Sequence, residues 1–147
     1  MTQAYPNTNL HIAGNWVPAI GGETIDVLNP ASEECIGKVA HARIEDLDLA
    51  LEAAQSGFDV WKKVSPMDRY KAMRKVASLL KERIDQIAVI LTQEQGKPIQ
   101  QSKGEIMLAV DIIDGFAEEG RRPYGRIIPA RMEGLMQSVT KEPVGPV

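Results

Sequence analysis

The residues of this chain that could act as nucleophiles, bases or zinc ligands are few and scattered. Cys35 is the only cysteine, and His11 and His41 are the only histidines. A catalytic thiol needs a base within hydrogen-bond reach and donors for an oxyanion, and no such partner stands near Cys35 in the sequence. A cysteine of this kind is usually a small packing residue. Two histidines this far apart, with no second cysteine, make no zinc motif.

The dipeptide Gly96-Lys97 suggests a phosphate-binding loop. That motif requires a glycine five residues before Gly96 and a serine or threonine after Lys97. Leu91 and Pro98 occupy those positions, so the motif is absent. No G-x-G-x-x-G sequence occurs either, so neither type of nucleotide loop is encoded here.

Two groups of charged residues remain as candidates for a binding or catalytic site. A basic run follows the last long helical segment, and four carboxylates lie within the helical region: Arg121, Arg122, Arg126 and Arg131, then Glu94, Glu105, Asp111 and Asp114. Such arginines usually compensate the dipole at the end of a helix and face the solvent. The alternative is that they form a site for an anion. Carboxylates on helices are usually solvated, although their spacing leaves a catalytic pair open.

Two long helical segments between Ser65 and Gly120 are the elements that must position these side chains. Ser65 is a candidate N-cap, and Pro66 suits the first helical position. The turn Gln95–Pro98 separates the segments, because glycine adopts the left-handed conformation that ends a helix. Apolar residues recur at steps of three and four: Tyr70, Met73, Ala77, Leu80, Ile84, Ile87 and Leu91, then Ile106, Val110, Ile113 and Ala117, with Ile112 and Phe116 widening the second stripe.

The region before these helices predicts strands and one further helix. Residues 1–9 are expected to be a mobile lead-in. A short hairpin at 10–18 and strands at 23–28 and 35–40 then predict a small antiparallel sheet. A helix follows over about 45–62, with its apolar stripe at Leu47, Ala50, Ala54, Phe58 and Trp61, although Arg43 stands where a capping side chain is expected. Residues 124–129 are expected to be a loop or extended, and 134–141 predicts a C-terminal strand.

Composition indicates a soluble globular chain of ordinary domain size: 147 residues, 44% hydrophobic and 25% charged. The net charge of −3 gives no reason to expect a nucleic acid or an anionic membrane as partner. No signal peptide or membrane span is recognisable, and a single cysteine fits a reducing compartment, so we expect a cytoplasmic protein. The apolar residues 143–147 resemble the start of a buried strand, which suggests that the chain has been cut from something larger.

A set of short motifs, in order along the chain, resembles the N-terminal portion of an aldehyde dehydrogenase. The sequence pieces are IAGNW at 12–16, IDVLNPA at 25–31, LTQEQGKP at 91–98, KGEI at 103–106, FAEEG at 116–120 and KEPVGPV at 141–147. The QGKP turn and the FAEEG sequence are most similar to the succinate-semialdehyde dehydrogenase branch. The resemblance implies the family's α/β fold, here as a small N-terminal antiparallel sheet, long helices and a C-terminal strand.

The resemblance also implies a division of the chain and a reaction. Residues 1–122 would begin the cofactor-binding domain, and 123–147 would begin the bridging element through which subunits associate. The family oxidises an aldehyde to a carboxylic acid with NAD or NADP, using a cysteine thiolate, a glutamate-activated water and an asparagine that helps to hold the oxyanion. All these groups belong to later sequence, so the chain alone is expected to be inactive, and Cys35 does not match the nucleophile motif.

Three further roles carry over from the resemblance. Val27 and Leu28 would supply backbone carbonyls, and Glu94 a carboxylate, to a monovalent cation such as Na⁺ or K⁺. The helix that bears Gly104 and Leu108 would line the substrate tunnel, although packing explains Leu108 equally well. The strand Leu135–Lys141 would pair with another subunit, which would make the protein a homo-oligomer. An alternative from a different class is a stand-alone helical interaction module without enzymatic activity.

Overall fold

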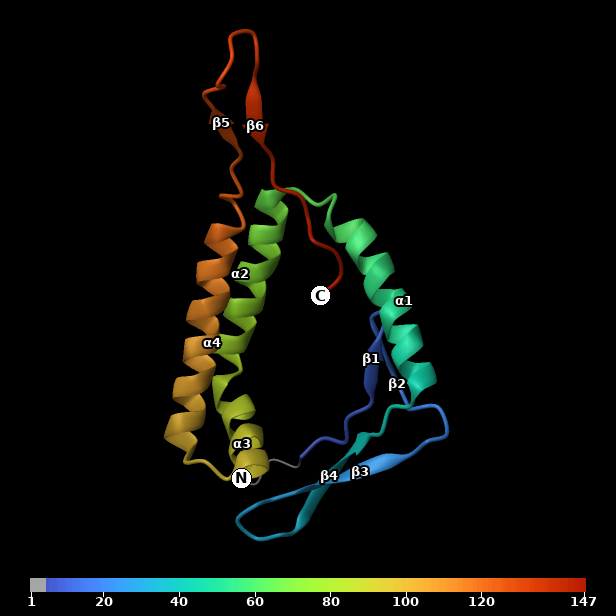
Figure 1. Cartoon of the computed structure of the whole chain (residues 1–147). Coiled ribbons are helices and arrows are strands. Elements are labelled where there is room, and N and C mark those ends of the chain that lie inside the picture. The colour runs from blue at the N-terminus through green and yellow to red at the C-terminus, as the bar shows by residue number, and fades with distance from the viewer. Residues whose placement is uncertain (1–4) are drawn as a thin grey trace.

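The computed structural model describes residues 5–147, and residues 1–4 lie outside the described part. Its elements in chain order are β1 (Leu10–Ile12), β2 (Asn15–Val17), β3 (Thr24–Leu28), β4 (Cys35–Ala40), α1 (Ile44–Trp61), α2 (Pro66–Glu82), α3 (Ile84–Gln95), α4 (Ile99–Glu119), β5 (Arg126–Ile128) and β6 (Gln137–Val139). Figure 1 shows an open frame, with α2, α3 and α4 packed together on one side and α1 on the other. The β3–β4 hairpin crosses between the two sides at one end, and the β5–β6 hairpin projects beyond the helices.

The core lies where α4 packs against α2 and α3. Small residues on α2 and α3 meet one stripe of α4, and the buried apolar members are Ala77, Ala88, Ile106, Val110 and Ala117. Ser102 is fully buried in the same stripe, and its hydroxyl lies 2.8 Å from that of Thr92 on α3. The expected stripe of α4 is therefore confirmed, but Ile112 and Phe116 lie on another, exposed face rather than widening it.

The first long helical segment is broken once, which the periodicity did not predict. Arg83, between α2 and α3, has φ −102° and ψ 12°, outside the helical region. Its amide is shared between the carbonyls of Leu79 and Leu80, so the last turn of α2 tightens before the chain resumes as α3. The apolar stripe continues across the break, which is why the sequence pattern shows no interruption.

The predicted helix ends between Ser65 and Gly96 are confirmed. The Ser65 hydroxyl accepts a hydrogen bond from the amide of Asp68 at 3.1 Å, and Pro66 opens α2. Gly96 ends α3 with φ 72°, the left-handed conformation that favours glycine. Pro98 then precedes α4 as its N-cap.

The expected antiparallel strands form, but as separate two-stranded hairpins: β1 with β2, and β3 with β4. Ala13 and Gly14 join the first pair with φ values of 49° and 82°. Two consecutive positive φ values make the tight turn whose twist suits a two-residue hairpin. Pro18 follows β2 and cannot donate a ladder hydrogen bond, which helps to end the pairing there.

The mobile lead-in was expected over residues 1–9; residues 1–4 lie outside the described part, whereas residues 7 and 8 are hydrogen-bonded to the outer edge of β4. The amide of Thr8 donates to the carbonyl of Lys38, and the amide of Ala40 donates to the carbonyl of Thr8, both at 2.9 Å. The Asn7 side chain accepts from the amide of Lys38, also at 2.9 Å. This segment therefore occupies part of an edge that the β3–β4 hairpin alone would leave unpaired.

Helix α1 is fixed at its start by Asp46, which is 3% exposed. The Asp46 carboxylate accepts hydrogen bonds from the amide of Arg43 at 2.9 Å and from the amide of Ile20 at 3.1 and 3.2 Å. An aspartate at the third helical position thus caps the helix in place of the side chain expected at Arg43.

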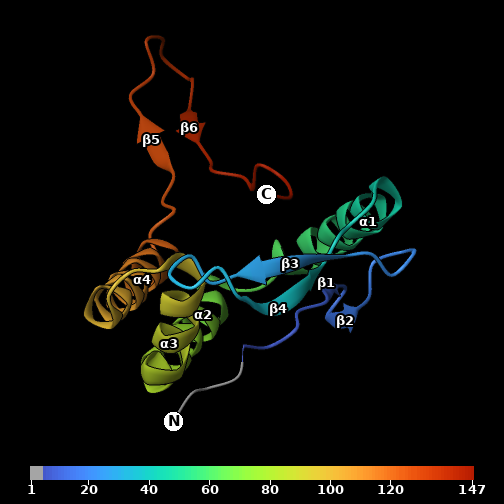
Figure 2. The ribbon, with the colours of Figure 1, turned by 90° about the horizontal axis from the view of Figure 1, so that it is seen from below.

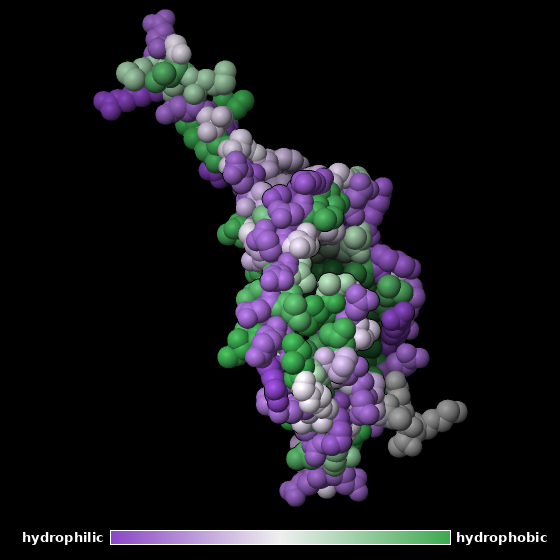
Figure 3. Space-filling view, turned by 90° about the vertical axis from the view of Figure 1, so that its right-hand side faces the viewer, coloured by the Kyte–Doolittle hydropathy of each residue, from purple (hydrophilic) through white to green (hydrophobic). Residues whose placement is uncertain are grey.

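The apolar stripe predicted on α1 is largely uncovered. Leu47 and Trp61 remain about half exposed, and Asp46 is the one buried residue of this helix. In Figure 2 α1 stands away from the packed helices, and Figure 3 shows apolar side chains gathered between polar ones on the side of the molecule that carries it. The stripe has the right period for a buried helix but lacks a covering element within residues 5–147.

The strand predicted at 134–141 is shorter than expected and pairs within the chain. Residues Gln137–Val139 form β6, antiparallel to β5 at Arg126–Ile128, with Ile127 opposite Ser138. Residues 140–147 then turn back toward the space between α1 and α2 (Figure 1). No helix within residues 5–147 is long and apolar enough to cross a membrane.

Candidate functional site

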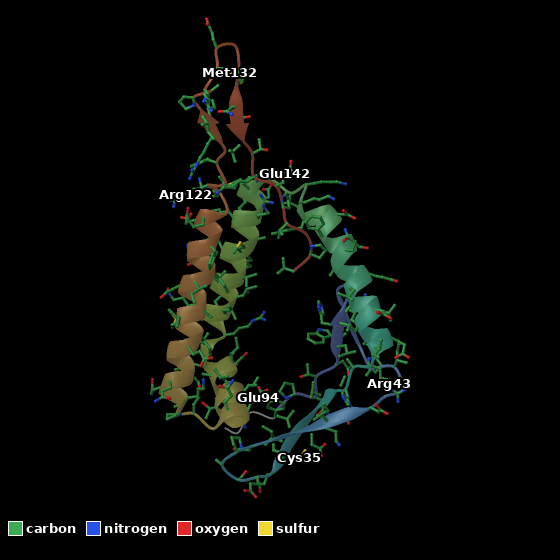
Figure 4. All side chains as sticks on the ribbon, viewed as in Figure 1. Cys35, Arg43, Glu94, Arg122, Met132 and Glu142 are labelled. Atoms are coloured by element: carbon green, nitrogen blue, oxygen red, sulfur yellow. The ribbon has the colours of Figure 1, made fainter. Side chains whose placement is uncertain are left out.

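The turn after β3 meets the end of α3, and this meeting brings the predicted cation ligands into one region. The Pro30 ring lies against Gly96, where a Cβ would come within 2.8 Å of the proline Cγ. The end of β3 is therefore held beside the last turn of α3, which carries Glu94. The turn after β3 and the last turn of α3 therefore lie together, although they are more than sixty residues apart in the sequence. We call this region, from Val27 to Pro30 and from Glu94 to Gly96, the corner (Figure 4).

The carbonyl candidates Val27 and Leu28 lie at an irregularity in the β3–β4 ladder. Val27 pairs with Gly37, whereas Leu28 pairs with Cys35, so the register shifts between the two residues. A bulge of this kind disrupts the ladder locally and bends the strand. It occurs at the two positions where the resemblance expects carbonyl groups to face an ion.

The Asn29 turn completes this end of the hairpin. Its amide donates to the carbonyl of Glu34 at 2.9 Å, and its side-chain oxygen accepts from the amide of Ala31 at 3.0 Å. Asn29 therefore fixes the chain direction immediately after Leu28 and ahead of the Pro30 contact.

Glu94 is exposed on the last turn of α3, and no salt bridge to it occurs within residues 5–147. The nearby Lys97 is paired with Glu105 instead. The neighbour of Glu94 is Tyr5, whose phenol pKa is raised by partial burial first, and then by the negative charge of Glu94 and a hydrogen bond to its carboxylate. The Glu94 carboxylate thus has a neutral donor beside it and no paired cation.

The resemblance assigns a singly charged, hard cation to these three positions. One carboxylate and two backbone carbonyls are oxygen ligands of the type that such ions prefer. The described residues contain no cluster of three or more His, Cys, Asp or Glu side chains that could hold a metal ion. A transition metal or a tightly held divalent ion would need more side-chain ligands than this corner provides.

The predicted tunnel residues Gly104 and Leu108 lie on the face of α4 that points away from the helical core. Leu108 is 59% exposed, and a Cβ on Gly104 would meet nothing within 4 Å. Ile112 and Phe116 extend this apolar face along the helix. Packing within residues 5–147 therefore does not explain Leu108.

The other candidates are separated or already paired. Cys35 is exposed at the start of β4, and its thiol donates to the carbonyl of Gly37. Asp114 pairs with Arg74 at 2.9 Å, rather than with another carboxylate. In the basic run, two arginines pair with acidic residues one turn earlier: Arg121 with Glu118 and Arg122 with Glu119.

Tyr5 is the residue of this corner that reasoning from the sequence missed. It stands in a stretch without hydrophobic periodicity, so no pattern signalled that its side chain is placed against Glu94. Asp46, by contrast, follows the spacing of a capping box, three residues after the N-cap position, and could have been identified from it.

Residues 16–147 match the model of the aldehyde dehydrogenase family. A 4-(hydroxymethyl)benzenesulfonate dehydrogenase of Comamonas testosteroni is 38% identical over 99% of this chain and 31% of its own length. The NADP⁺ succinate-semialdehyde dehydrogenase of Escherichia coli is 37% identical over 91% of this chain and 28% of its own length. The crystal structure of succinate-semialdehyde dehydrogenase from Burkholderia pseudomallei superposes with a TM-score of 0.91 at 36% identity, covering 94% of this chain and 29% of that one.

These matches agree with the α/β fold class and with the family motifs that are spread along the sequence. The chain spans less than a third of the length of each of these relatives. The family model covers nearly all of the described residues, including the Val27–Glu94 corner and the whole of α4. The chain therefore belongs to the aldehyde dehydrogenase family.

Proposed function

We propose that this chain is the N-terminal portion of an NAD(P)-dependent aldehyde dehydrogenase, and that the whole protein oxidises an aldehyde to a carboxylic acid. The observation that carries the proposal is the family match over residues 16–147 together with a structural match at a TM-score of 0.91. The single, exposed cysteine fits a reducing compartment such as the cytoplasm.

The exposed surface supports a role as part of a larger protein. The chain exposes 11190 Å² at a mass of 16.2 kDa, whereas a compact monomer of that mass exposes about 7,500 Å². The difference of about 3,700 Å² is surface that a compact protein of this mass would not expose. A stand-alone interaction module would bind its partner through exposed apolar faces. In a larger enzyme, further polypeptide of the same protein would cover the same faces.

The residues around the C-terminal segment indicate where such polypeptide would lie. A hollow of about 450 Å³ separates α1 and α2 from this segment, lined by Phe58, Trp61 and Arg69 from the helices and by Pro143 and Val144 from the segment. Side chains of both polar and apolar type face it. The proposed cofactor-binding domain, which begins in residues 1–122, would continue into this space.

We assign an anionic aldehyde as the substrate class. Two of the relatives act on succinate semialdehyde and one on a benzenesulfonate derivative, and each of these molecules carries a negative group remote from the reacting carbon. The exposed face of α4, with Gly104, Leu108 and Phe116, would form one wall of the passage to the reacting carbon. An apolar wall would bind the carbon skeleton and leave the recognition of the anion to other residues.

The full-length protein should produce NAD(P)H when it is mixed with NAD⁺ or NADP⁺ and succinate semialdehyde, as followed by ultraviolet absorbance. Butanal, which has the same chain length but no carboxylate, is the matched control and should react with at least about tenfold lower kcat/KM, the effect of losing one charged contact. Purified residues 1–147 should give no NAD(P)H with either aldehyde. Absence of turnover by the full-length protein with a range of aldehydes would contradict the proposal.

We also propose that Val27, Leu28 and Glu94 hold Na⁺ or K⁺. The support is the bulge at Val27 and Leu28, the Pro30–Gly96 contact that holds the end of β3 beside α3, and the exposed carboxylate of Glu94, which has no salt bridge within residues 5–147. The ion would stabilise the corner by joining β3 to α3. It would supply no chemistry to the reacting aldehyde.

Replacing Glu94 by glutamine should remove the cation dependence of stability. In the full-length protein, exchanging choline chloride for sodium or potassium chloride at constant ionic strength should raise the wild-type melting temperature by a few degrees. The Glu94→Gln variant should show no such rise, because a neutral amide binds a cation weakly. Glu52→Gln, which changes an exposed carboxylate of α1, is the control and should respond like the wild type.

The β5–β6 hairpin is the proposed contact between subunits. Its exposed apolar side chains include Ile127 at 85% and Met136 at 86%, which is unusual for a two-stranded ribbon facing water. Strands this short leave open edges, and an edge of this kind pairs readily with another chain. A homo-oligomer that joins through Leu135–Lys141 would cover both features.

A further inference from the structure

The direction of the β5–β6 hairpin is not set by packing on the helices. Every residue of both strands is exposed, from Arg126 to Ile128 and from Gln137 to Val139. In Figures 1 and 2, which view the chain from two perpendicular directions, the hairpin stands clear of the helices. The backbone at the base of the hairpin, where its two chains meet, is therefore what can aim it.

The closest approach at this base is made by Gly125, the residue before β5. A Cβ there would overlap the carbonyl oxygen of Val139 and would lie 3.9 Å from the Cα of Thr140. Val139 ends β6 and pairs with Arg126, so the overlap falls beside the first pair of the ladder. A backbone carbonyl moves only if its strand moves with it. Only glycine therefore lets the two strands close at this end as they do here.

The chain that leads to the base of the hairpin is held at the end of α4. The amide of Arg121 donates to the carbonyl of Glu118 at 3.1 Å, and the amide of Arg122 donates to that of Glu119 at 2.9 Å. The amide of Tyr124 then donates to the carbonyl of Arg122 at 2.7 Å. Because the incoming chain is fixed in this way, an added methyl group at the base would be relieved by displacing β6.

We infer that Gly125 is a positioning residue for the contact between subunits: by letting β6 close on β5 at the base, it sets the direction in which the hairpin meets a second copy of this chain. This inference rests on the subunit contact proposed above. The apolar side chains that the hairpin exposes, Ile127 and Met136, follow the path of its two chains. A displaced β6 would present them in the wrong place, and a symmetric oligomer would repeat that error at every equivalent contact.

Adding one methyl group at the base tests the inference. In the full-length protein, Gly125→Ala should raise the subunit concentration at which half of the oligomer is dissociated by at least about tenfold. Mass photometry over a dilution series measures this concentration. The far-ultraviolet circular dichroism should stay unchanged, because the packed helices do not depend on the hairpin. A midpoint equal to that of the wild type would overturn the inference.

Gly134→Ala is the matched control in the same hairpin. Gly134 lies between the two strands, where φ is 79° and a Cβ would meet nothing within 4 Å. Alanine there strains the turn but leaves the base closed, so the dissociation midpoint should rise by no more than about threefold. Equal increases for the two variants would mean that any loss of hairpin stability weakens assembly, and the specific role of Gly125 would be overturned.

Ile127→Lys separates a failure of this inference from a failure of the proposed contact, because it removes an exposed apolar side chain without altering the base. If Ile127→Lys dissociates the oligomer and Gly125→Ala does not, the contact stands and the role of Gly125 is overturned. If the wild type is a monomer throughout, or Ile127→Lys leaves its oligomer intact, the contact is absent and the role of Gly125 is overturned with it. The formation of NAD(P)H tests the proposed reaction independently of all three variants.

Discussion

Replacing Asp46 by alanine is expected to lower the free energy of unfolding of the full-length protein by about 2–4 kcal/mol. The carboxylate is 3% exposed and accepts the amides of Ile20 and Arg43. Alanine would leave both donors without partners and free the start of α1 from the segment that follows β2. Chemical denaturation followed by circular dichroism measures the change.

Two variants separate the capping role of Asp46 from its charge. Asp46→Asn keeps one acceptor oxygen and should cost less than the alanine change. Glu45→Ala removes an exposed carboxylate from the same helical turn and should cost no more than about 0.5 kcal/mol, the size of an exposed helix-dipole interaction. Equal losses for Asp46→Ala and Glu45→Ala would mean that general electrostatics, rather than the two hydrogen bonds, stabilise the helix start.

The second large effect is expected for Gly96→Ala, at about 2–3 kcal/mol of lost stability. The left-handed φ of 72° alone costs an alanine about 1–2 kcal/mol. The added Cβ would also meet the Pro30 ring at 2.8 Å and push the β3–β4 turn away from α3. The variant should therefore lose the cation response as well as stability.

Gly14→Ala is the matched control for this change. Gly14 also has a positive φ, of 82°, but a Cβ there would meet nothing within 4 Å. Its substitution should cost only the conformational strain and should leave the cation response intact. If the two alanine variants lose the same stability and both respond to sodium, the Pro30–Gly96 contact does not hold the corner together.

The helices were the part of the fold that the sequence specified best. The Ser65 cap, the Gly96 end and the stripe through Ile106 and Val110 each depend on residues close together in the chain, so local rules recover them. The break at Arg83 could not be predicted, because the backbone leaves the helical conformation at this one residue without interrupting the apolar pattern. The hairpin of β1 and β2 was predicted, but the pairing of β3 with β4 in a separate two-stranded sheet was not, since alternation predicts a strand but not its partner.

The candidate site likewise combines residues that could be named from the sequence with contacts that only the structure shows. The resemblance to the family named Val27, Leu28 and Glu94, but only the structure shows the Pro30–Gly96 contact that joins their segments. The placement of Tyr5 depends on backbone hydrogen bonds to β4 and on the missing side chain of Gly37. Long-range contacts of this kind leave no periodic signal in a single sequence.

The contrast between the packed helices and the uncovered α1 has a consequence for the order in which a ribosome-bound chain can fold. Helices α2, α3 and α4 are consecutive in sequence, and contacts between neighbouring segments form fast. The stripe of α1, with Leu47 and Trp61 still half exposed, is synthesised before them and would have to wait for the later part of the enzyme that we propose. Throughout that interval α1 presents an apolar surface of the type that chaperones bind, so the growing chain should be most prone to aggregation after its first helical core is already complete.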